Sequence, residues 1–422
     1  MSLLIEGVSH RVAPLDVRER LFIDGEGLRE WLTTIGSAPG LNGAAILCTC
    51  GRTEFYLMAD DPEVARAEVR RLLAEIDALD AWLGHAYSLD REAAIAHLFR
   101  VPAGLDSVVI GESQILGQFK AAMADAREAM SLDPGLEFLM QRAVNVAKRV
   151  RSETEIGRRP VGFGQAAVVQ AQAKLGDLTG RSALIVGAGK MAGATARSLA
   201  AAGMGRLFFS NRTRERAATL ASEMPARVPT VAISHADIEE AAVESDLIVT
   251  SSSSPDHIIG RPMAERLMAA RGGRPLFLLD LAVPRDVSPD VVEVAGVHLS
   301  NIDDLGAATQ AAFAGRWEDM PVAEAIVADE VGRARADLGQ RRADPAITAL
   351  VGSMEARRQR LLRSVPASLT PEQQDEVDRV TRAITARLLH DPILYLRDSA
   401  RDPAALDRAR RMLGLGEAEG VE

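Results

Sequence analysis

The hydrophobic pattern of the first third of the chain mixes short apolar runs with helical spacing. The runs LLIEGVSH, AAILC and TEFYLMA have the length and composition of strands, whereas the stretch from Pro62 to Leu83 is predicted to be helical. This mixture predicts an α+β domain. We place the first domain at residues 1–160, which includes the start of the helix that follows.

A helical spacer is expected next. From Leu136 to about Glu153 the apolar residues step by three and four, and a second helical stretch runs from Gln165 to Leu175. We expect the two stretches to form one long spacer, or spinal helix.

The pattern then changes to buried strands that alternate with helices. A strand from Ala183 to Val186 leads into a glycine turn and a helix of small residues, and a second strand spans Leu207 to Ser210. The apolar runs in SDLIVTSSSS and PLFLLDLAVP extend the parallel sheet. This order predicts a Rossmann-like domain over residues 161–304.

The last hundred residues, in contrast, are predicted to be helical throughout. Four apolar positions lie three or four residues apart behind the helix-start signal Thr370-Pro371-Glu372, namely Val377, Val380, Ile384 and Leu388. Such a stripe suits either a partner surface or an intramolecular bundle. Residues 305–422 therefore complete a multidomain α/β fold with an all-α C-terminal domain.

Composition restricts the class of protein further. With 422 residues, 47% of them hydrophobic and 26% charged, the chain suits a globular protein of two or three domains. No apolar run approaches the ~20 residues of a membrane span, and the start has no long apolar segment, so we expect a cytoplasmic protein with no membrane contact. The net charge of −10 argues against a general DNA-binding protein.

One stretch departs from this acidic balance. Between Arg333 and Arg363 there are eight arginines and three acidic residues, a local excess of five positive charges. A solvated helix face explains such a run, and contact with nucleic-acid phosphates is the alternative.

The segment IVGAGKMAG matches the dinucleotide-binding pattern G-x-G-x-x-[GA]. The first glycine allows a tight turn, the second lets the backbone approach a pyrophosphate, and the small third residue lets the helix pack on its strand. The expected contacts are Gly187, Ala188, Gly189, Lys190, Met191 and Ala192. A glycine turn that serves only helix packing is the alternative.

The end of the next strand indicates which nucleotide is bound. An NAD site usually has Asp or Glu there, whereas this chain has Asn211, Arg212 and Thr213. A guanidinium group suits a 2′-phosphate, so we infer NADPH rather than NADH. Alternatively, Arg212 is a surface residue that caps the following helix.

The chain has two cysteines, Cys48 and Cys50, which are too close in sequence for an unstrained disulfide. Cys48 follows Leu47 in an apolar run and suits a structural role. Cys50 has a polar, turn-like setting, and the positive charge of Arg52 is expected to favour its thiolate, the nucleophilic form. Two cysteines without a CxxC pair make a poor metal site, so we expect no metal.

A hydride donor and a nucleophilic thiol on one chain indicate a reaction class. Hydride does not readily reduce an ester, but an acyl group passed to sulfur is a better acceptor and leaves as an aldehyde. The combination predicts acyl reduction by NADPH through an enzyme thioester.

At this point the chain resembles the glutamyl-tRNA reductase family over nearly its whole length. The matching segments, in order, are GVSHRVAPLDVRERL, CTCGRTEFY, HLFRVPAGLDSVVIGESQILGQFK, RSETEIG, LIVGAGKMA, SNRT, DLAVPRDVSP with NIDDL, and ARLLHDPILYLR. The resemblance implies NADPH-dependent conversion of the glutamyl group of glutamyl-tRNA(Glu) to glutamate-1-semialdehyde, the first committed step of tetrapyrrole (porphyrin and heme) biosynthesis.

The resemblance also implies roles for single residues. Cys50 falls on the family's nucleophile, Arg52 on the arginine that holds the substrate carboxylate, and His97 on the active-site histidine, which transfers a proton or polarises the carbonyl. Further residues are implied to line the substrate pocket, namely Thr49, Ser107, Glu112, Gln114 and Gln118. Glu112 is alternatively a structural anchor.

Two departures from the family pattern lie close to the implied site. Gly51 replaces the usual asparagine beside the nucleophile, and Gly162 to Gln165, GFGQ, stands where the family has a serine-rich segment. Lys190 and Ser113 replace a glutamate and a proline elsewhere.

The resemblance implies partners as well. It implies a V-shaped homodimer joined through the helical domain, contact of the basic run with tRNA phosphates, and transfer of the product to glutamate-1-semialdehyde aminomutase. Two rival interpretations remain: an NADPH dehydrogenase of a small keto acid, related to shikimate dehydrogenases, and a catalytically impaired relative that binds tRNA or nucleotide.

Overall fold

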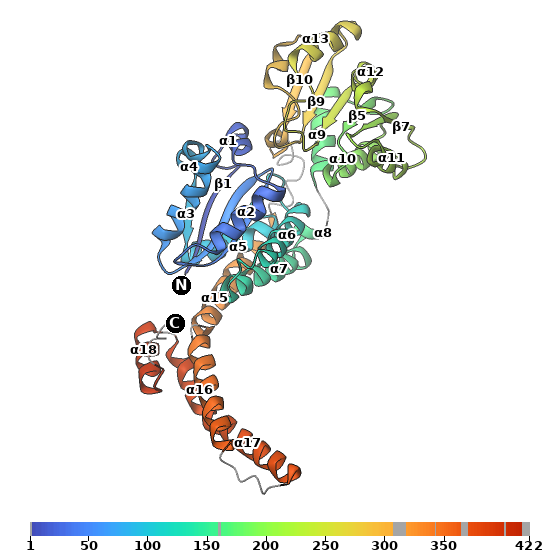
Figure 1. Ribbon diagram of the computed structural model, residues 1–422. Coiled ribbons are helices and arrows are strands. Elements are labelled where there is room, and N and C mark those ends of the chain that lie inside the picture. Colours follow the sequence, from blue (N-terminus) through green and yellow to red (C-terminus); the bar gives the residue numbers. More distant parts are fainter. Residues whose placement is uncertain are drawn as a thin grey trace. The chain divides into compact units, whose positions relative to one another are not determined.

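The computed structural model describes residues 2–158, 162–306, 318–341, 343–363, 370–400 and 402–415. The chain divides into two compact units, residues 1–329 and 330–422, and each is described by itself. Within the first unit we call residues 2–158 the α+β region and residues 162–306 the parallel-sheet region (Figure 1).

The α+β region is built on a four-stranded antiparallel sheet. Its strands are β1 (Ser2–Ser9), β2 (Leu41–Thr49), β3 (Arg52–Ala59) and β4 (Tyr87–Asp90), in the order β2-β3-β1-β4. The three strands predicted from sequence are confirmed, and β4 was not predicted. Thr49 pairs with Arg52, so Cys50 and Gly51 alone form the turn of the β2–β3 hairpin.

Seven helices surround this sheet: α1 (Leu15–Arg20), α2 (Gly25–Gly36), α3 (Pro62–Glu75), α4 (Leu79–His85), α5 (Arg91–Ala103), α6 (Gln114–Glu128) and α7 (Pro134–Glu153). The single helix expected from Pro62 to Leu83 is two helices, because Asp77 adopts a left-handed backbone (φ 54°) between α3 and α4.

Strand β3 is buried along its whole length, and its two faces differ. Phe55 packs between Trp31 and Trp82, with ring centroids 5.9 and 5.6 Å away. The other face carries Arg52, Glu54 and Tyr56, because side chains two residues apart on a strand point the same way. A row of polar side chains is thus built into the middle of a core.

The expected single spacer helix is divided. Helix α7 ends at Glu153, because the backbone of the next residue, Thr154, is extended (φ −131°, ψ 162°). It is followed by α8 (Glu155–Arg158) and α9 (Phe163–Leu175). The Thr154 hydroxyl donates to the carbonyl of Val150 at 2.7 Å, which caps the end of α7.

The parallel-sheet region has six parallel strands in the order β10-β9-β8-β5-β6-β7. They are β5 (Ser182–Val186), β6 (Arg206–Ser210), β7 (Thr230–Ile233), β8 (Leu247–Thr250), β9 (Leu276–Asp280) and β10 (Val297–Asn301). The helices are α9, α10 (Lys190–Ala201), α11 (Arg214–Ser222), α12 (Ile238–Glu244) and α13 (Arg261–Ala270), with 3₁₀ turns η1 (His235–Asp237) and η2 (Pro289–Glu293). The strand order reverses between β5 and β8, which is where doubly wound sheets bind ligands.

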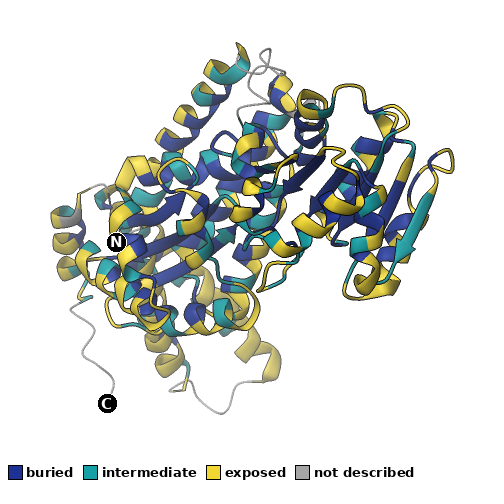
Figure 2. Cartoon of the chain, turned by 90° about the horizontal axis from the view of Figure 1, so that it is seen from above, coloured by how far each residue is buried: buried dark blue, intermediate teal, exposed yellow. Residues whose placement is uncertain are grey.

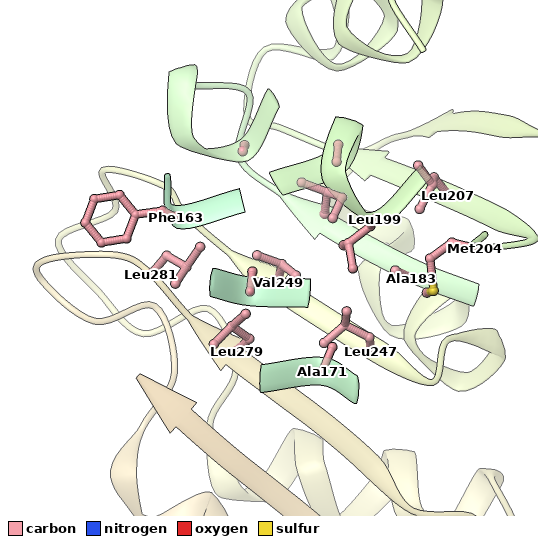
Figure 3. Close-up of a cluster of buried hydrophobic side chains, with 14 of the residues drawn as sticks. Phe163, Ala171, Ala183, Leu199, Met204, Leu207, Leu247, Val249, Leu279 and Leu281 are labelled. Carbon is pink, nitrogen blue, oxygen red and sulfur yellow. The ribbon is translucent and has the colours of Figure 1, made fainter. Parts of the chain in front are cut away.

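One face of this sheet packs against α9 and α10 through a buried apolar cluster. Figure 3 shows Ala171 of α9 and Leu199 of α10 beside Leu247 and Val249 of β8. A Cβ atom on Gly164 would lie 2.6 Å from the Ala194 carbonyl oxygen, so glycine is needed for α9 to approach α10. The GFGQ departure therefore has a packing explanation.

The remaining helices are α15 (Met320–Arg341), α16 (Asp344–Leu362), α17 (Pro371–Ser399) and α18 (Pro403–Met412), which confirm the predicted helical region. Leu350, Leu389 and Leu396 belong to a small core formed by α16, α17 and α18. Figure 2 shows the contrast between buried strands and the exposed outer faces of the helices. Within the described ranges, no helix is both long and apolar enough to cross a membrane.

Candidate active site

The β2–β3 turn is held in place from three sides. The Gly51 N–H donates to the Thr49 hydroxyl at 3.3 Å, and the His10 N–H donates to the Gly51 carbonyl at 2.9 Å. The guanidinium group of Arg18 donates to the Cys50 carbonyl. Thr49 is buried and engaged within the turn, so a substrate contact through its side chain stays a prediction.

Cys50 does not have the thiolate-favouring surroundings expected from sequence. Its side chain is half-buried and packs against an apolar cluster that combines Leu15 and Val109 with residues of the parallel-sheet region. Burial, and after it the charge of Glu112, raise the pKa of the Cys50 thiol to about 12, although Arg18 acts in the opposite direction. The expectation that Arg52 lowers this pKa is therefore wrong in this arrangement.

Arg52 instead faces two carboxylates. One nitrogen donates to Glu54 at 2.7 Å, and the other donates to the carbonyl and, at 3.0 Å, to the carboxylate of Asp106. Asp106 also pairs with Arg11 at 2.6 Å. Burial opposes ionisation of Asp106, but Arg52 and Arg11 outweigh it and lower its pKa. Only 2% of Arg52 is exposed, so it is not a free anion-binding group here.

Glu54 joins Arg52 to His97. Its carboxylate lies 2.9 Å from Nε2 of His97 and accepts the hydroxyls of Tyr56 and Tyr87. Burial alone would raise the pKa of Glu54, but Arg52 and His97 lower it well below its ordinary value, so Glu54 is ionised. A histidine held in this way has a fixed ring orientation.

The sequence spacing explains how this cluster forms. Gly7 of β1 lies between Glu54 of β3 and Tyr87 of β4 in the sheet register. A Cβ atom on Gly7 would lie 2.8 Å from Cγ of Glu54 and 2.9 Å from the Tyr87 ring. Glycine therefore lets the Tyr87 hydroxyl reach Glu54 across β1.

The residues expected to line the substrate pocket differ in burial and in their contacts. Glu112 is buried, and its carboxylate accepts the N–H groups of Gln114 and Ile115 at 2.7 and 2.9 Å, as an anchor for the start of α6. Gln114 and Gln118 are half-buried one turn apart on α6, and half-buried Ser107 follows Asp106. No described contact joins Ser107, Gln114 or Gln118 to Cys50.

Sequence reasoning missed five residues around the turn: His10, Arg18, Glu54, Tyr87 and Asp106. One signal was available, because charged residues at alternate positions of an otherwise apolar strand, as in RTEFY, require buried partners. Nothing local in the sequence identified those partners.

The glycine turn has the geometry that its motif predicts. Gly187 has φ 112°, and a Cβ atom there would collide with the Ser251 carbonyl oxygen. Gly189 precedes α10 and has open space where a side chain would be. Ala192 is fully buried against the sheet. A helix start with uncapped N–H groups and a clear approach suits a pyrophosphate, so the residues fit a dinucleotide.

The residues after β6 are open to solvent. Arg212 is exposed and has no ion pair among the described residues, while the Asn211 amide donates to the Thr213 carbonyl at 3.0 Å. Lys190 is exposed and Met191 is half-buried at the start of α10.

Part of the basic run between Arg333 and Arg363 is already paired. Arg358 is buried between Glu355 and Asp378, at 2.6 Å from each, and Arg342 lies outside the described residues.

Three family models match the chain. Residues 7–154 match the N-terminal domain of glutamyl-tRNAGlu reductase, residues 169–308 match shikimate / quinate 5-dehydrogenase, and residues 322–415 match the dimerisation domain of glutamyl-tRNAGlu reductase.

Full-length relatives agree with these matches. The chain is 38% identical to the glutamyl-tRNA reductase of Solibacter usitatus (strain Ellin6076), over 96% of each chain. It is 34% identical to that of Marinomonas sp. (strain MWYL1), over 99% of each. The solved structure of glutamyl-tRNA reductase from Methanopyrus kandleri shares 28% identity with a TM-score of 0.50, and the match covers 98% of this chain and 99% of that one.

Proposed function

The chain belongs to the glutamyl-tRNA reductase family, and from this premise we propose that it reduces the glutamyl group of glutamyl-tRNA(Glu) to glutamate-1-semialdehyde through a thioester on Cys50. The observation that carries the proposal is the position of Cys50. It is one of two residues in a tight turn, held by backbone contacts, next to the Arg52–Glu54–His97 chain and against the parallel-sheet region.

In the first step, the Cys50 sulfur loses its proton and forms a bond to the ester carbon of the substrate. The bond from that carbon to the tRNA 3′ oxygen breaks, and the tRNA leaves with a proton on that oxygen. His97 is our candidate for moving protons. Its Nε2 is held by Glu54, so Nδ1 is the nitrogen left to exchange a proton with the substrate.

Arg52 can hold the substrate carboxylate only by exchanging a partner. Its contact with Asp106 at 3.0 Å is the one to release, because Asp106 keeps a second partner in Arg11. Ser107, Gln114 and Gln118 remain our candidates for the rest of the pocket, whereas Glu112 and Thr49 act by shaping α6 and the turn.

The parallel-sheet region carries a nicotinamide cofactor site, and we assign it to NADPH. The main-chain N–H groups at the start of α10 would hold the pyrophosphate, with Gly187, Gly189 and Ala192 giving it room. Arg212 would bind the 2′-phosphate, since Asn211 and Thr213 offer no carboxylate to repel it. When bound, the nicotinamide supplies the hydride that releases the acyl group as an aldehyde.

The assembly we propose is a homodimer through the helical region. Val380, Ile384 and Leu388 of α17 are 41%, 53% and 63% exposed, and such an apolar row suits a second copy of the chain. We further propose a cytoplasmic enzyme that passes its aldehyde to glutamate-1-semialdehyde aminomutase. Contact of the basic run with tRNA would fall to its exposed arginines, not to Arg358.

Intact-protein mass spectrometry tests the thioester directly. The protein is mixed with glutamyl-tRNA without NADPH, and the measurement is repeated with Cys50→Ser and with the matched control Cys48→Ser. We expect a glutamyl adduct in the wild type and in Cys48→Ser, none in Cys50→Ser, and its discharge as aldehyde when NADPH is added.

Two outcomes would refute the proposal. Full NADPH-dependent turnover by Cys50→Ser would favour a keto acid dehydrogenase, which has no need of the thiol. Folded protein that binds glutamyl-tRNA but forms neither adduct nor aldehyde would favour the impaired relative.

A further inference from the structure

Two adjacent charged residues near the end of helix α1 both contact the parallel-sheet region. Arg18 pairs with Asp303, and Glu19 accepts from the Arg285 backbone N–H at 2.6 Å and from its guanidinium group at 2.7 Å. Leu15, on the same short helix, belongs to the apolar cluster that includes Leu281 and Ile302. The contact is therefore both apolar and ionic.

The two ion pairs differ in one respect. Arg18 also donates to the Cys50 carbonyl with a second nitrogen, whereas no described contact joins Glu19 or Arg285 to the nucleophile turn. The Arg18 side chain is 3% exposed, so its guanidinium group is shielded from water, whereas the Asp303 side chain is 35% exposed. Both bonds involve the charge of Arg18, which makes them stronger than bonds between neutral groups.

We propose that Arg18 is a positioning residue that fixes the nucleophile turn while Asp303 of the parallel-sheet region is bound to it. The Cys50 carbonyl and the Gly51 N–H belong to the same peptide unit, so a guanidinium group on that carbonyl fixes the plane of the turn. Asp303 in turn fixes the guanidinium group. The turn thereby becomes ordered in the arrangement in which the cofactor-binding region covers the thiol.

The inference rests on the proposed function, because it matters only if Cys50 carries an acyl group that the cofactor must reach. It assigns different roles to two residues of α1. Glu19 helps to hold the two regions together, while Arg18 links their contact to the turn that contains Cys50. A lysine could replace the charge of Arg18, but it has no second nitrogen with which to donate to the Cys50 carbonyl and to Asp303 separately.

Hydrogen exchange of the Gly51 amide, followed by mass spectrometry with residue-level fragmentation, tests the inference in the full-length protein without tRNA or nucleotide. We expect Asp303→Ala and Arg18→Gln each to speed this exchange about tenfold, the effect of losing one charge-assisted hydrogen bond. In a protein that already carries Arg18→Gln, Asp303→Ala should speed the exchange by less than a further factor of about two, because Asp303 acts on the turn only through Arg18. The matched control, Glu19→Ala, should change it less than about twofold.

The inference is wrong if Asp303→Ala leaves the Gly51 amide unchanged, or if Glu19→Ala speeds it as much as Asp303→Ala does. Thermal unfolding confirms that each variant is folded, and Arg18→Lys replaces Arg18→Gln if the latter is not. Because the exchange needs neither substrate nor turnover, failure of the thioester experiment would leave this result standing, and the reverse also holds.

Discussion

Two buried carboxylates, one in each sheet, have almost the same exposure, but their pKa values are shifted in opposite directions. Glu54 in β3 is 0% exposed, and Asp280 at the end of β9 is 1% exposed. The pKa of Glu54 lies well below its ordinary value, whereas burial raises the pKa of Asp280 to about 7.

The difference lies in the charge of the hydrogen-bond donors. Glu54 accepts from Arg52 and His97, which carry or can carry a positive charge. Asp280 accepts from the Thr250 hydroxyl at 2.8 Å and from the N–H groups of Ala282 and Val287 at 3.0 Å, all of them neutral. Three neutral donors satisfy the oxygens of a buried carboxylate without offsetting the desolvation of its charge.

The contrast suggests different tasks for the two sites. An ionised Glu54 can orient His97 and hold Arg52 at constant charge, which suits a region where a substrate must be positioned. Asp280 orders the segment 281–287 after β9 through bonds to the N–H groups of Ala282 and Val287, and there shape matters more than charge. Four predictions, three from single variants and one from a pair, would break or sharpen this comparison.

The largest effect is expected from Glu54→Gln. The change leaves Arg52 buried with only Asp106 as a charged partner, so we expect a loss of about 3–5 kcal/mol in the free energy of unfolding. Because the folded pKa of Glu54 is lowered, its stabilisation is present above the ordinary value of 4.5 and is lost as the pH falls. The variant should therefore flatten the acid side of the stability profile, measured by urea unfolding at several pH values.

Glu6→Gln is a control for this variant. Glu6 is buried and pairs with Arg66 at 3.1 Å, but the Arg66 side chain is 24% exposed and keeps Glu63 as a second partner, so the loss should be below about 1 kcal/mol. Equal losses in the two variants would contradict the central place of Glu54.

Gly7→Ala is expected to have the next largest effect. The added methyl group meets Glu54 and Tyr87 at less than 3 Å, so we expect about 1–3 kcal/mol of destabilisation, with separation of Tyr87 from Glu54. Thermal unfolding measures it. At Gly51 a Cβ atom meets nothing closer than 4.0 Å, so Gly51→Ala should change stability by less than about 0.5 kcal/mol.

Asp280→Asn should lower the free energy of unfolding by about 1–3 kcal/mol. This is less than the loss for Glu54→Gln, because no buried cation loses its partner. The amide group would face the Val287 N–H, donor against donor. The folded pKa of Asp280 is raised, so its favourable protonated state is fully present below 3.8 and is lost as the pH rises toward 7. The difference between wild type and variant should hence be greater at pH 5 than at pH 8 in urea unfolding. An equal difference at the two pH values would show that Asp280 is ionised throughout this range.

The smallest effects are expected from removing one phenol at a time. Tyr56→Phe and Tyr87→Phe each take one donor from Glu54 and should each cost about 0.5–1.5 kcal/mol. Only Tyr87 also lies against His97, with ring centroids 5.6 Å apart. The pH dependence of aldehyde formation should therefore shift in Tyr87→Phe and not in Tyr56→Phe. Identical profiles would remove Tyr87 from the active site.

The sequence by itself determined the architecture and the kinds of chemistry. Periodicity depends on neighbouring residues alone, so it predicted β1, β2, β3, β5, β6, β8, β9 and the helical region, but not β4, β7 or β10. The sequence predicted the glycine turn after β5 by its motif. It also singled out Cys50, Arg52 and His97, by residue type and by family resemblance. It did not reveal that Asp77 and Thr154 interrupt helices, because local backbone conformation there overrides the apolar spacing.

Only the tertiary structure decided how the groups of the candidate active site are charged. Arg52 is paired with Asp106, 54 residues away, and Glu54 with His97, 43 residues away, so no local pattern reports these contacts. The raised pKa of Cys50 likewise follows from burial and from the charge of Glu112, which only the folded chain brings near the thiol. The charge of a group depends on its distance from other charges and from water, and those distances exist only in the folded chain.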